Sequence, residues 1–185
     1  MNGGSPGGPK ATSRVDGASG MVGLVDACIP ALRRYAAVLA RNPQDQDDLV
    51  HDCLVRALDR WHTRRDDASL RSWLFAIMHN LFVSRLRKRK IEVTPIDSVP
   101  EQKYRVPANQ ERYLEFGDVV QALHRLPEEQ RSVLVLIAVE DLSYAEAAQV
   151  LNVPIGTVMS RLSRGRERLR VILEGDAQSE AVRAK

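Results

Sequence analysis

The chain has 185 residues, a formal net charge of +3 and only two cysteines. This length allows one large or two small domains, and so mild a basic balance excludes few partners by itself. No apolar run approaches the roughly 18 residues of a membrane span, and the N-terminus lacks the apolar core of a signal peptide. We therefore expect a cytoplasmic protein without a membrane span.

The two cysteines, Cys28 and Cys53, lie on apolar positions of predicted helices, with no CxxC motif and no histidine at ligand spacing. Buried free thiols are the simpler interpretation, and a redox switch is the alternative. The sequence indicates no cofactor and no metal.

The N-terminal residues 1–20 are rich in Gly, Ser and Pro, so they cannot bury enough surface to offset the entropy of ordering, and we predict a disordered tail. From Met21 the apolar residues keep a helical spacing until Asn42-Pro43, where a helix must end. This pattern predicts one helix over that stretch.

A second helix is predicted from about Asp45 to Trp61. Its apolar face is formed by Leu49, Val50, Cys53, Leu54, Ala57, Leu58 and Trp61. Its outer face begins with Asp45, Asp47, Asp48 and Asp52. Acidic residues near a helix N-terminus are favourable by themselves. The alternative is a docking surface for a basic partner, and the pattern alone leaves both explanations open.

Residues 62–69 form a predicted polar loop, and a helix follows over about 70–90. This helix is apolar almost all round from Trp73 to Val83, so it must be covered on more than one side. His79 and Asn80 interrupt the apolar run. A buried amide without partners costs about 1–3 kcal/mol, so Asn80 needs either a bond to a neighbouring helix or an outside ligand.

The end of this helix is strongly basic, with Arg85, Arg87, Lys88, Arg89 and Lys90 in close succession. Basic residues suit a helix C-terminus. So many like charges nevertheless repel each other, and an anionic partner such as a phosphate backbone would relieve the repulsion.

Residues 92–114 contain several prolines, mixed charge and no apolar periodicity, which predicts an extended linker between two domains. Helical periodicity resumes near Phe116, and Pro127 opens a further helix.

Residues 142–170 read as two helices joined by a tight turn. Ser143 and Glu146 form a predicted capping box, Asn152 suits a left-handed turn position, and Pro154 stands where the second helix begins. The second helix has a predicted buried stripe of Ile155, Val158, Leu162, Gly165, Leu169 and Ile172. A glycine on that stripe indicates a close helix contact. From Gly175 we expect a polar, frayed tail over 175–185.

The opposite face of this second helix carries small, polar or basic residues, namely Gly156, Thr157, Met159, Ser160, Ser163 and Arg164, with further charge from Arg161, Arg166, Arg168 and Arg170. A helix that enters the major groove of DNA needs an apolar inner face and such an outer face. An ordinary helical hairpin with a solvated basic face is the alternative.

The remaining signals favour a binding protein over an enzyme. No segment alternates like a strand, and the sequence has no Gly-rich phosphate loop, no HExxH and no nucleophile in a local signature. We therefore expect an all-helical protein of two small domains with a flexible connection.

The order of these segments resembles the bacterial RNA polymerase sigma factors of the extracytoplasmic-function (ECF) group, over about residues 22–173. The resemblance lies in DDLVHDCLVRALDRW, LRSWLFAIMHNLFVSRLRKRK and the stretch from LHRLPEEQRS to RGRERLR, together with the short linker. It implies sigma domain 2 at 21–91, a linker at 92–114 and sigma domain 4 with its helix-turn-helix at 115–174.

The resemblance also implies roles for single residues. By this resemblance, Asp48, His51 and Asp52 contact the basic β′ clamp helices of core RNA polymerase. The polymerase is also expected to contact the chain through its β subunit. Contact with the −10 promoter element falls to Trp61, Asn80, Arg85, Arg87 and Lys88, with Trp61 and the 62–69 loop at a flipped base. Contact with the −35 element falls to Thr157, Met159, Ser160, Arg161, Ser163 and Arg164. His51 stands where the family often has Gln, and Met159 where it often has a basic residue.

The expected function is therefore promoter recognition and DNA melting in a stress or environmental response, under an anti-sigma factor. A stand-alone helix-turn-helix regulator is one alternative, and it would bind duplex promoter DNA without polymerase. A sigma mimic that only titrates an anti-sigma protein is another. Such a mimic could lose its DNA-facing cations, which this chain keeps in both domains.

Overall fold

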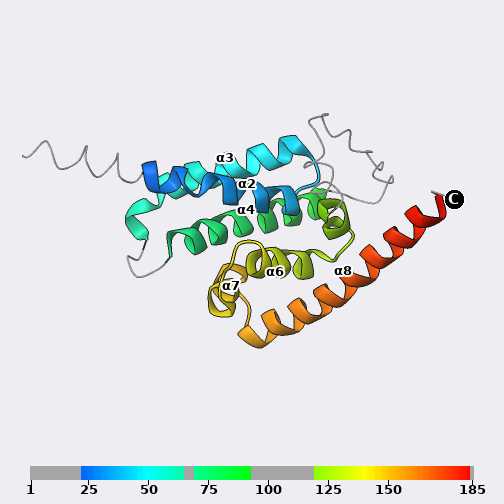
Figure 1. The fold of residues 1–185 in the computed structure, drawn as a ribbon. Coiled ribbons are helices and arrows are strands. Elements are labelled where there is room, and N and C mark those ends of the chain that lie inside the picture. The colour runs from blue at the N-terminus through cyan, green and yellow to red at the C-terminus, as the bar shows by residue number, and fades with distance from the viewer. Residues whose placement is uncertain (1–21, 65–68, 93–118, 184–185) are drawn as a thin grey trace, which may run out of the picture.

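A computed structural model describes residues 22–64, 69–92 and 119–183, and all regular structure in these ranges is helical. The predicted tail at 1–20, nearly all of the predicted linker at 92–114 and the middle of the 62–69 loop lie outside the described residues. Figure 1 shows α2, α3 and α4 on one side of the molecule and α6, α7 and the long α8 on the other.

The first predicted helix is interrupted. Residues 22–26 are helical, residues 27–28 form a turn, and α2 then runs over Ile29–Leu39 with Pro30 in its first turn. The prediction of one helix from Met21 to Asn42 was wrong because it passed over Pro30. A proline lacks the amide hydrogen that would bond to the carbonyl of Asp26, and its ring clashes with that carbonyl.

The next helices form the rest of the first domain: α3 (Pro43–Asp59), the short 3-10 helix η1 (Trp61–Thr63) and α4 (Leu70–Glu92). The Asn42 side chain caps α3 by accepting a bond from the Gln44 amide at 2.9 Å. Helices α2, α3 and α4 pack against one another. Their centre includes Tyr35 and Phe75, whose rings meet edge to face at 5.3 Å.

The second domain contains a helical stretch at 119–124, then α6 (Glu128–Ala138), α7 (Tyr144–Leu151) and α8 (Ile155–Arg183). Helix α8 runs past Gly175 to Arg183, so the expected frayed tail from 175 is largely helical. An ion pair of 2.7 Å between Arg125 and Asp176 holds the beginning of this extension to the domain.

The helix-turn-helix forms as its local signals predict. Ser143 and Glu146 make the reciprocal bonds of a capping box, and Asn152 has a φ of 52°. Gly165 is needed for a close contact, because a Cβ there would lie 3.1 Å from a methyl group of Leu134. The predicted stripe is wrong only at Ile155, whose side chain is 48% exposed, because the buried part of the stripe begins one turn later, at Val158.

The two domains pack into one body. Helix α4 lies against α7, helix α2 lies against α6, and the buried side chains of both domains belong to one hydrophobic cluster. The sequence predicted a flexible connection and gave no indication of this packing. The two candidate DNA-facing surfaces therefore lie on one packed body in this structure.

Candidate nucleic-acid interface

A groove of about 500 Å³ runs between α3 and α4. It is lined by Asp52, Arg56, Arg60, Trp73, Ala76, Ile77, Asn80, Leu81, Ser84, Arg85 and Lys88. Apolar and aromatic side chains lie there together with cations. Single-stranded nucleic acid prefers such a surface, because bases stack on aromatic rings while cations follow the phosphates.

Asn80 lies in this groove and is exposed, whereas its neighbour His79 is buried. The ring Nδ1 of His79 forms a hydrogen bond of 3.1 Å with the Tyr35 hydroxyl. Burial lowers the pKa of His79 to about 4, and the positive charge of Arg161 adds to this effect. The two polar interruptions of α4 therefore differ, because His79 has a partner in the core and Asn80 faces solvent.

An aromatic pair stands beside the groove. The ring of Trp61, on η1, meets the ring of Trp73 edge to face at 6.2 Å, and the guanidinium of Arg64 lies 5.2 Å from the Trp61 ring. Trp73 lines the groove itself, although the sequence indicated only Trp61. The sequence analysis also missed Arg56, Arg60 and Ser84. A groove between two helices has no local sequence signal, because its two walls come from separate segments.

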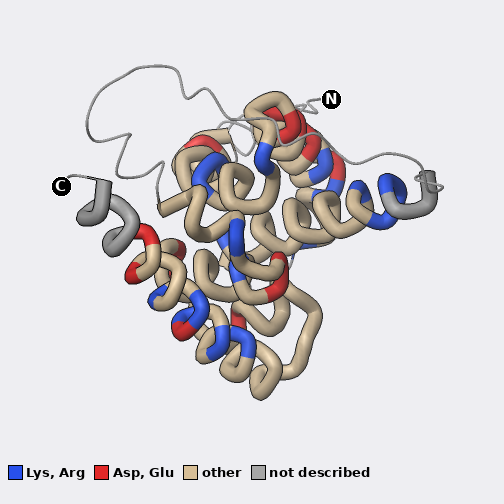
Figure 2. The backbone as a smooth tube through the Cα atoms, turned by 90° about the vertical axis from the view of Figure 1, so that its right-hand side faces the viewer, with Lys and Arg blue, Asp and Glu red and all other residues tan. Residues whose placement is uncertain are grey.

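The basic end of α4 lies against the acidic start of α3. Arg85 pairs with Asp52 at 2.5 Å and donates to the backbone oxygen of Asp48 at 3.2 Å, and Arg89 pairs with Asp45 at 3.1 Å. The predicted −10 residues Arg87 and Lys88 are exposed on the same end. Figure 2 shows this end of α4 in blue.

The outer face of α3 combines acidic and apolar side chains. Asp48, His51 and Asp52 are exposed, and Val55 and Leu58 follow on the same helix with exposures of 45% and 48%. We call these five residues the α3 strip. The sequence placed Leu58 on the buried face, and this was wrong, because Ala57 takes the buried place next to it.

The start of α8 presents four of the six predicted −35 residues to solvent: Met159, Ser160, Ser163 and Arg164. The Arg164 side chain lies back along the helix, with Nε donating to the Ser160 carbonyl at 3.1 Å and Nη2 to the Ser160 hydroxyl at 3.3 Å. Thr157 and Arg161 are half-buried. The positive charge of Arg161 also contributes to the lowered pKa of His79 on α4.

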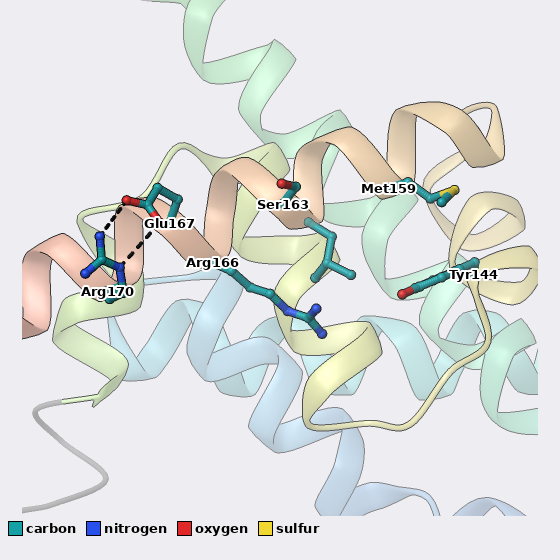
Figure 3. A pocket seen from close by; sticks show the side chains of 7 residues that line it. Tyr144, Met159, Ser163, Arg166, Glu167 and Arg170 are labelled. Atoms are coloured by element: carbon teal, nitrogen blue, oxygen red, sulfur yellow. Dashed lines mark hydrogen bonds and ion pairs between the residues drawn. The ribbon is translucent and has the colours of Figure 1, made fainter.

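A hollow of about 550 Å³ borders this face of α8. In Figure 3 the Tyr144 ring and the Met159 side chain occupy one end of the hollow, and the ion pair of Glu167 with Arg170 occupies the other, with Arg166 between them. The sequence gave no role to Tyr144. Its aromatic ring is exposed at the start of α7, which only the structure shows.

Both thiols are free, Cys53 in the core and Cys28 half-buried. Burial raises the pKa of Cys28, and it raises the pKa of Cys53 to about 12, so both stay protonated. Within the described ranges no cluster of His, Cys, Asp or Glu could hold a metal ion. The same part of the chain contains no helix that is both long and apolar enough to cross a bilayer.

Comparison with known proteins places both domains in known families. The family model described as Sigma-70, region 4 matches residues 116–169, and the Sigma2 domain of PhyR matches residues 25–79. The ECF RNA polymerase sigma factor EcfG of Rhodopseudomonas palustris is 37% identical over 150 residues, which are 81% of this chain and 83% of that protein.

Two further comparisons agree. The ECF RNA polymerase sigma factor SigM of Mycobacterium tuberculosis is 38% identical over 77% of this chain and 71% of that protein. The sigma factor RpoE from Bartonella quintana, solved in complex with the anti-sigma factor NepR, is 33% identical with a TM-score of 0.67, over 80% of this chain and 92% of that one. The chain therefore belongs to the ECF group of RNA polymerase sigma factors, which act in transcription initiation.

Proposed function

We propose that the chain binds core RNA polymerase through the α3 strip, captures the unpaired −10 strand in the α3–α4 groove and reads the −35 duplex with the start of α8. The observation that carries the proposal is the groove, because it gathers four cations, an indole ring and the exposed Asn80 amide in one hollow. An ordinary helical bundle has no need of such a surface.

In the groove, Trp73 offers a stacking surface and Asn80 offers hydrogen bonds to a base edge. Taking a base out of the duplex costs a few kcal/mol. Stacking returns about 1–3 kcal/mol per base, and the phosphate contacts of Arg56, Arg60 and Lys88 add to it. Binding to the separated strand therefore favours the melted promoter over the closed duplex.

On α8, the exposed residues Ser160, Ser163 and Arg164 can donate hydrogen bonds to base edges or phosphates. Met159 and the Tyr144 ring add an apolar contact that suits a thymine methyl group in the major groove. Each direct base contact of this kind is worth about 1–3 kcal/mol. The order of the side chains along the helix would then set the preferred −35 sequence.

The α3 strip fits a partner surface that is basic and partly apolar. Opposite charges across an interface speed encounter and fix its register, while Val55 and Leu58 supply apolar contact area. The basic β′ clamp helices of the polymerase are the partner we propose for this strip, together with a further contact to the β subunit. The covalent chemistry of transcription would belong to the polymerase, and this chain would act in the cytoplasm without catalysis.

We also propose control by an anti-sigma factor. The support is that the related RpoE was solved bound to the anti-sigma factor NepR. A second candidate function is a sigma mimic that only titrates such a regulator. It is supported by the match to the Sigma2 domain of PhyR, because PhyR from Bartonella quintana was solved as an anti-anti-sigma factor in complex with NepR. The cations of the groove and of α8 argue for DNA binding instead.

Run-off transcription tests the proposal. Core polymerase, the full chain and genomic promoter fragments should give discrete transcripts that core polymerase alone does not give. The matched variant carries Arg56→Ala and Arg60→Ala in the groove, and it should keep polymerase binding but lose most transcripts. A chain that binds an anti-sigma protein yet never supports transcription would be the mimic, and our proposal would be wrong.

A further inference from the structure

Three exposed apolar side chains lie at the start of the two helices of the helix-turn-helix. Tyr144 is the first residue of α7, Ile155 is the first residue of α8, and Met159 lies one turn further along α8. Met159 and the Tyr144 ring share one end of the hollow beside α8 (Figure 3). Ile155 and Met159 are neighbours on the helix surface, because residues four positions apart lie on the same side. We call these three residues the apolar patch.

Packing within the domain does not account for the apolar patch. On the same helix, the buried side chains of Val158 and Leu162 belong to the core. Single exposed apolar residues are normal on a protein surface and need no explanation. The patch is different because its members are grouped at the face of α8 that carries Ser160, Ser163 and Arg164. This grouping indicates a contact surface.

Two polar side chains next to Met159 are already bonded within α8. The Ser160 hydroxyl donates to the Thr157 carbonyl at 3.1 Å and accepts a bond from Nη2 of Arg164 at 3.3 Å. Ser160 and Arg164 must therefore exchange partners before they can bond to a base edge. An apolar contact by Met159 requires no such exchange, because the flexible thioether side chain adapts its shape to the group that it meets.

The charges near the apolar patch indicate duplex DNA as its partner. Arg164, Arg166 and Arg168 are exposed on the same helix, and Arg166 lines the hollow itself. Such cations suit the phosphates on either side of a groove. Among the four DNA bases, only thymine presents an apolar group in the major groove, its 5-methyl group. An apolar patch beside cations therefore fits a thymine methyl group better than any other base edge.

We propose that the apolar patch makes this chain select thymine at one base pair of the −35 element, and that Met159 is the residue that determines the choice. This inference deepens the proposed −35 contact and rests on the proposed function. Methionine has no hydrogen to donate to the acceptors of guanine, whereas a lysine at this position could bond to guanine O6 and N7. The soft thioether of Met159 instead fits a methyl group, with the Tyr144 ring beside it.

Deoxyuridine tests the contact, because its base differs from thymine only by lacking the 5-methyl group. The Kd is measured for holoenzyme, formed from core polymerase and the full chain, on promoter fragments in which the thymines of the −35 element are replaced by deoxyuridine one at a time. One replacement should raise the Kd about fourfold, the factor for one buried methyl group. At that position, 5-methylcytosine should bind about fourfold more tightly than cytosine, which separates the methyl group from the rest of the thymine base.

Met159→Lys and Val171→Lys form a matched pair of variants. Each replaces an exposed apolar residue of α8 with lysine, at exposures of 53% for Met159 and 56% for Val171. Met159→Lys should remove the difference in Kd between thymine and deoxyuridine and should favour guanine at that base pair. Val171→Lys, much further along α8, should keep the wild-type ratio. Because the ratio compares two DNA fragments with one protein, a general loss of stability does not change it.

Equal Kd values for all deoxyuridine fragments would overturn the inference, and so would a thymine preference that survives Met159→Lys. With normal run-off transcription, either result leaves the proposed function standing. If the chain forms no holoenzyme, the proposed function fails, and duplexes that the free full chain selects from a random-sequence pool decide the inference by the same comparison of thymine with deoxyuridine. A pool that shows no enrichment would overturn it as well.

Discussion

The guanidinium of Arg85 and the carboxylate of Asp52 form an ion pair of 2.5 Å between α4 and α3. Asp52 belongs to the α3 strip and, like Arg85, lines the groove, so the two proposed surfaces meet at this pair. The side chains are 31% and 48% exposed, and such pairs contribute at most about 1 kcal/mol to stability. A phosphate or a basic partner can therefore replace either member at little cost.

Because of this shared border, Asp48 is the cleaner position for testing polymerase binding. Asp52→Lys would place a second cation beside Arg85, whereas the exposed Asp48 lies one turn earlier on the α3 strip. We expect Asp48→Lys to abolish co-purification with core polymerase at moderate salt. Asp26→Lys makes the same charge change on an exposed residue before α2 and should co-purify normally. Equal recovery of both variants would remove Asp48 from the interface.

Asn80→Ala should separate stability from function. Asn80 is exposed, so the substitution should change the free energy of unfolding of the protein by no more than about 0.5 kcal/mol. Open-complex formation on a duplex promoter should nevertheless fall, and a template already melted around −10 should not restore it fully, because the base contact itself is lost. Gln121→Ala removes an exposed amide from the other domain and should transcribe normally. Wild-type transcription by Asn80→Ala would rule out the contact.

Arg164→Ala should weaken promoter binding by about 1–3 kcal/mol, the value of one direct contact in the major groove. Arg168→Ala is the control, because it removes an exposed cation from the same helix one turn later. Binding can be measured on a promoter fragment and on the same fragment with a scrambled −35 element. The loss from Arg164→Ala should vanish on the scrambled fragment, and a loss of equal size on both would indicate only a general phosphate contact.

Local signals predicted the local structure of the helix-turn-helix. The capping box of Ser143 with Glu146 and the left-handed Asn152 each involve groups within a few residues, so the sequence alone contains the cause. Periodicity was less reliable at the ends of a packed face. It assigned Leu58 and Ile155 to the core, because a period shows which side of a helix is apolar but not where the neighbouring helix stops.

The contacts between the domains could not be predicted from the sequence. Arg34 and Glu140 are 106 positions apart, and nothing near either residue indicates the other. Arg161 shows the consequence at the candidate site. Its spacing on α8 agreed with a −35 role, yet the structure leaves it half-buried, and its charge helps to lower the pKa of His79 on α4. The groove residues Arg56 and Trp73 were missed because two helices must pack before that surface exists.

A pair of glycines tests the close packing of α8. An alanine at Gly165 would meet Leu134 at 3.1 Å and the backbone oxygen of Gln130 at 3.3 Å, whereas an alanine at Gly175 would meet nothing within 4 Å. Replacing a helical glycine gains about 1 kcal/mol in propensity, but overpacking costs about 1–3 kcal/mol. Thermal unfolding should therefore show Gly165→Ala less stable than wild type and Gly175→Ala slightly more stable. A stabilised Gly165→Ala would show that α6 can move away from α8.

The last prediction concerns stability against pH. Burial, with a further effect of Arg161, lowers the pKa of His79 to about 4 from its usual 6.5. In the unfolded chain the His79 imidazole therefore binds a proton below about pH 6.5, whereas in the folded chain it binds one only below about pH 4. The unfolding free energy should fall across this window, by roughly 3 kcal/mol for this group, and it should lose nothing more from His79 at lower pH. His124 adds a loss of the same sign, because burial, together with Arg131, lowers its pKa to about 4 as well.

Urea unfolding between pH 4 and 7 measures this dependence. The slope of the unfolding free energy against pH should be smaller for His79→Gln than for wild type, with the exposed His62→Gln as control. If His79→Gln kept the wild-type slope, the buried, neutral state of His79 would be wrong.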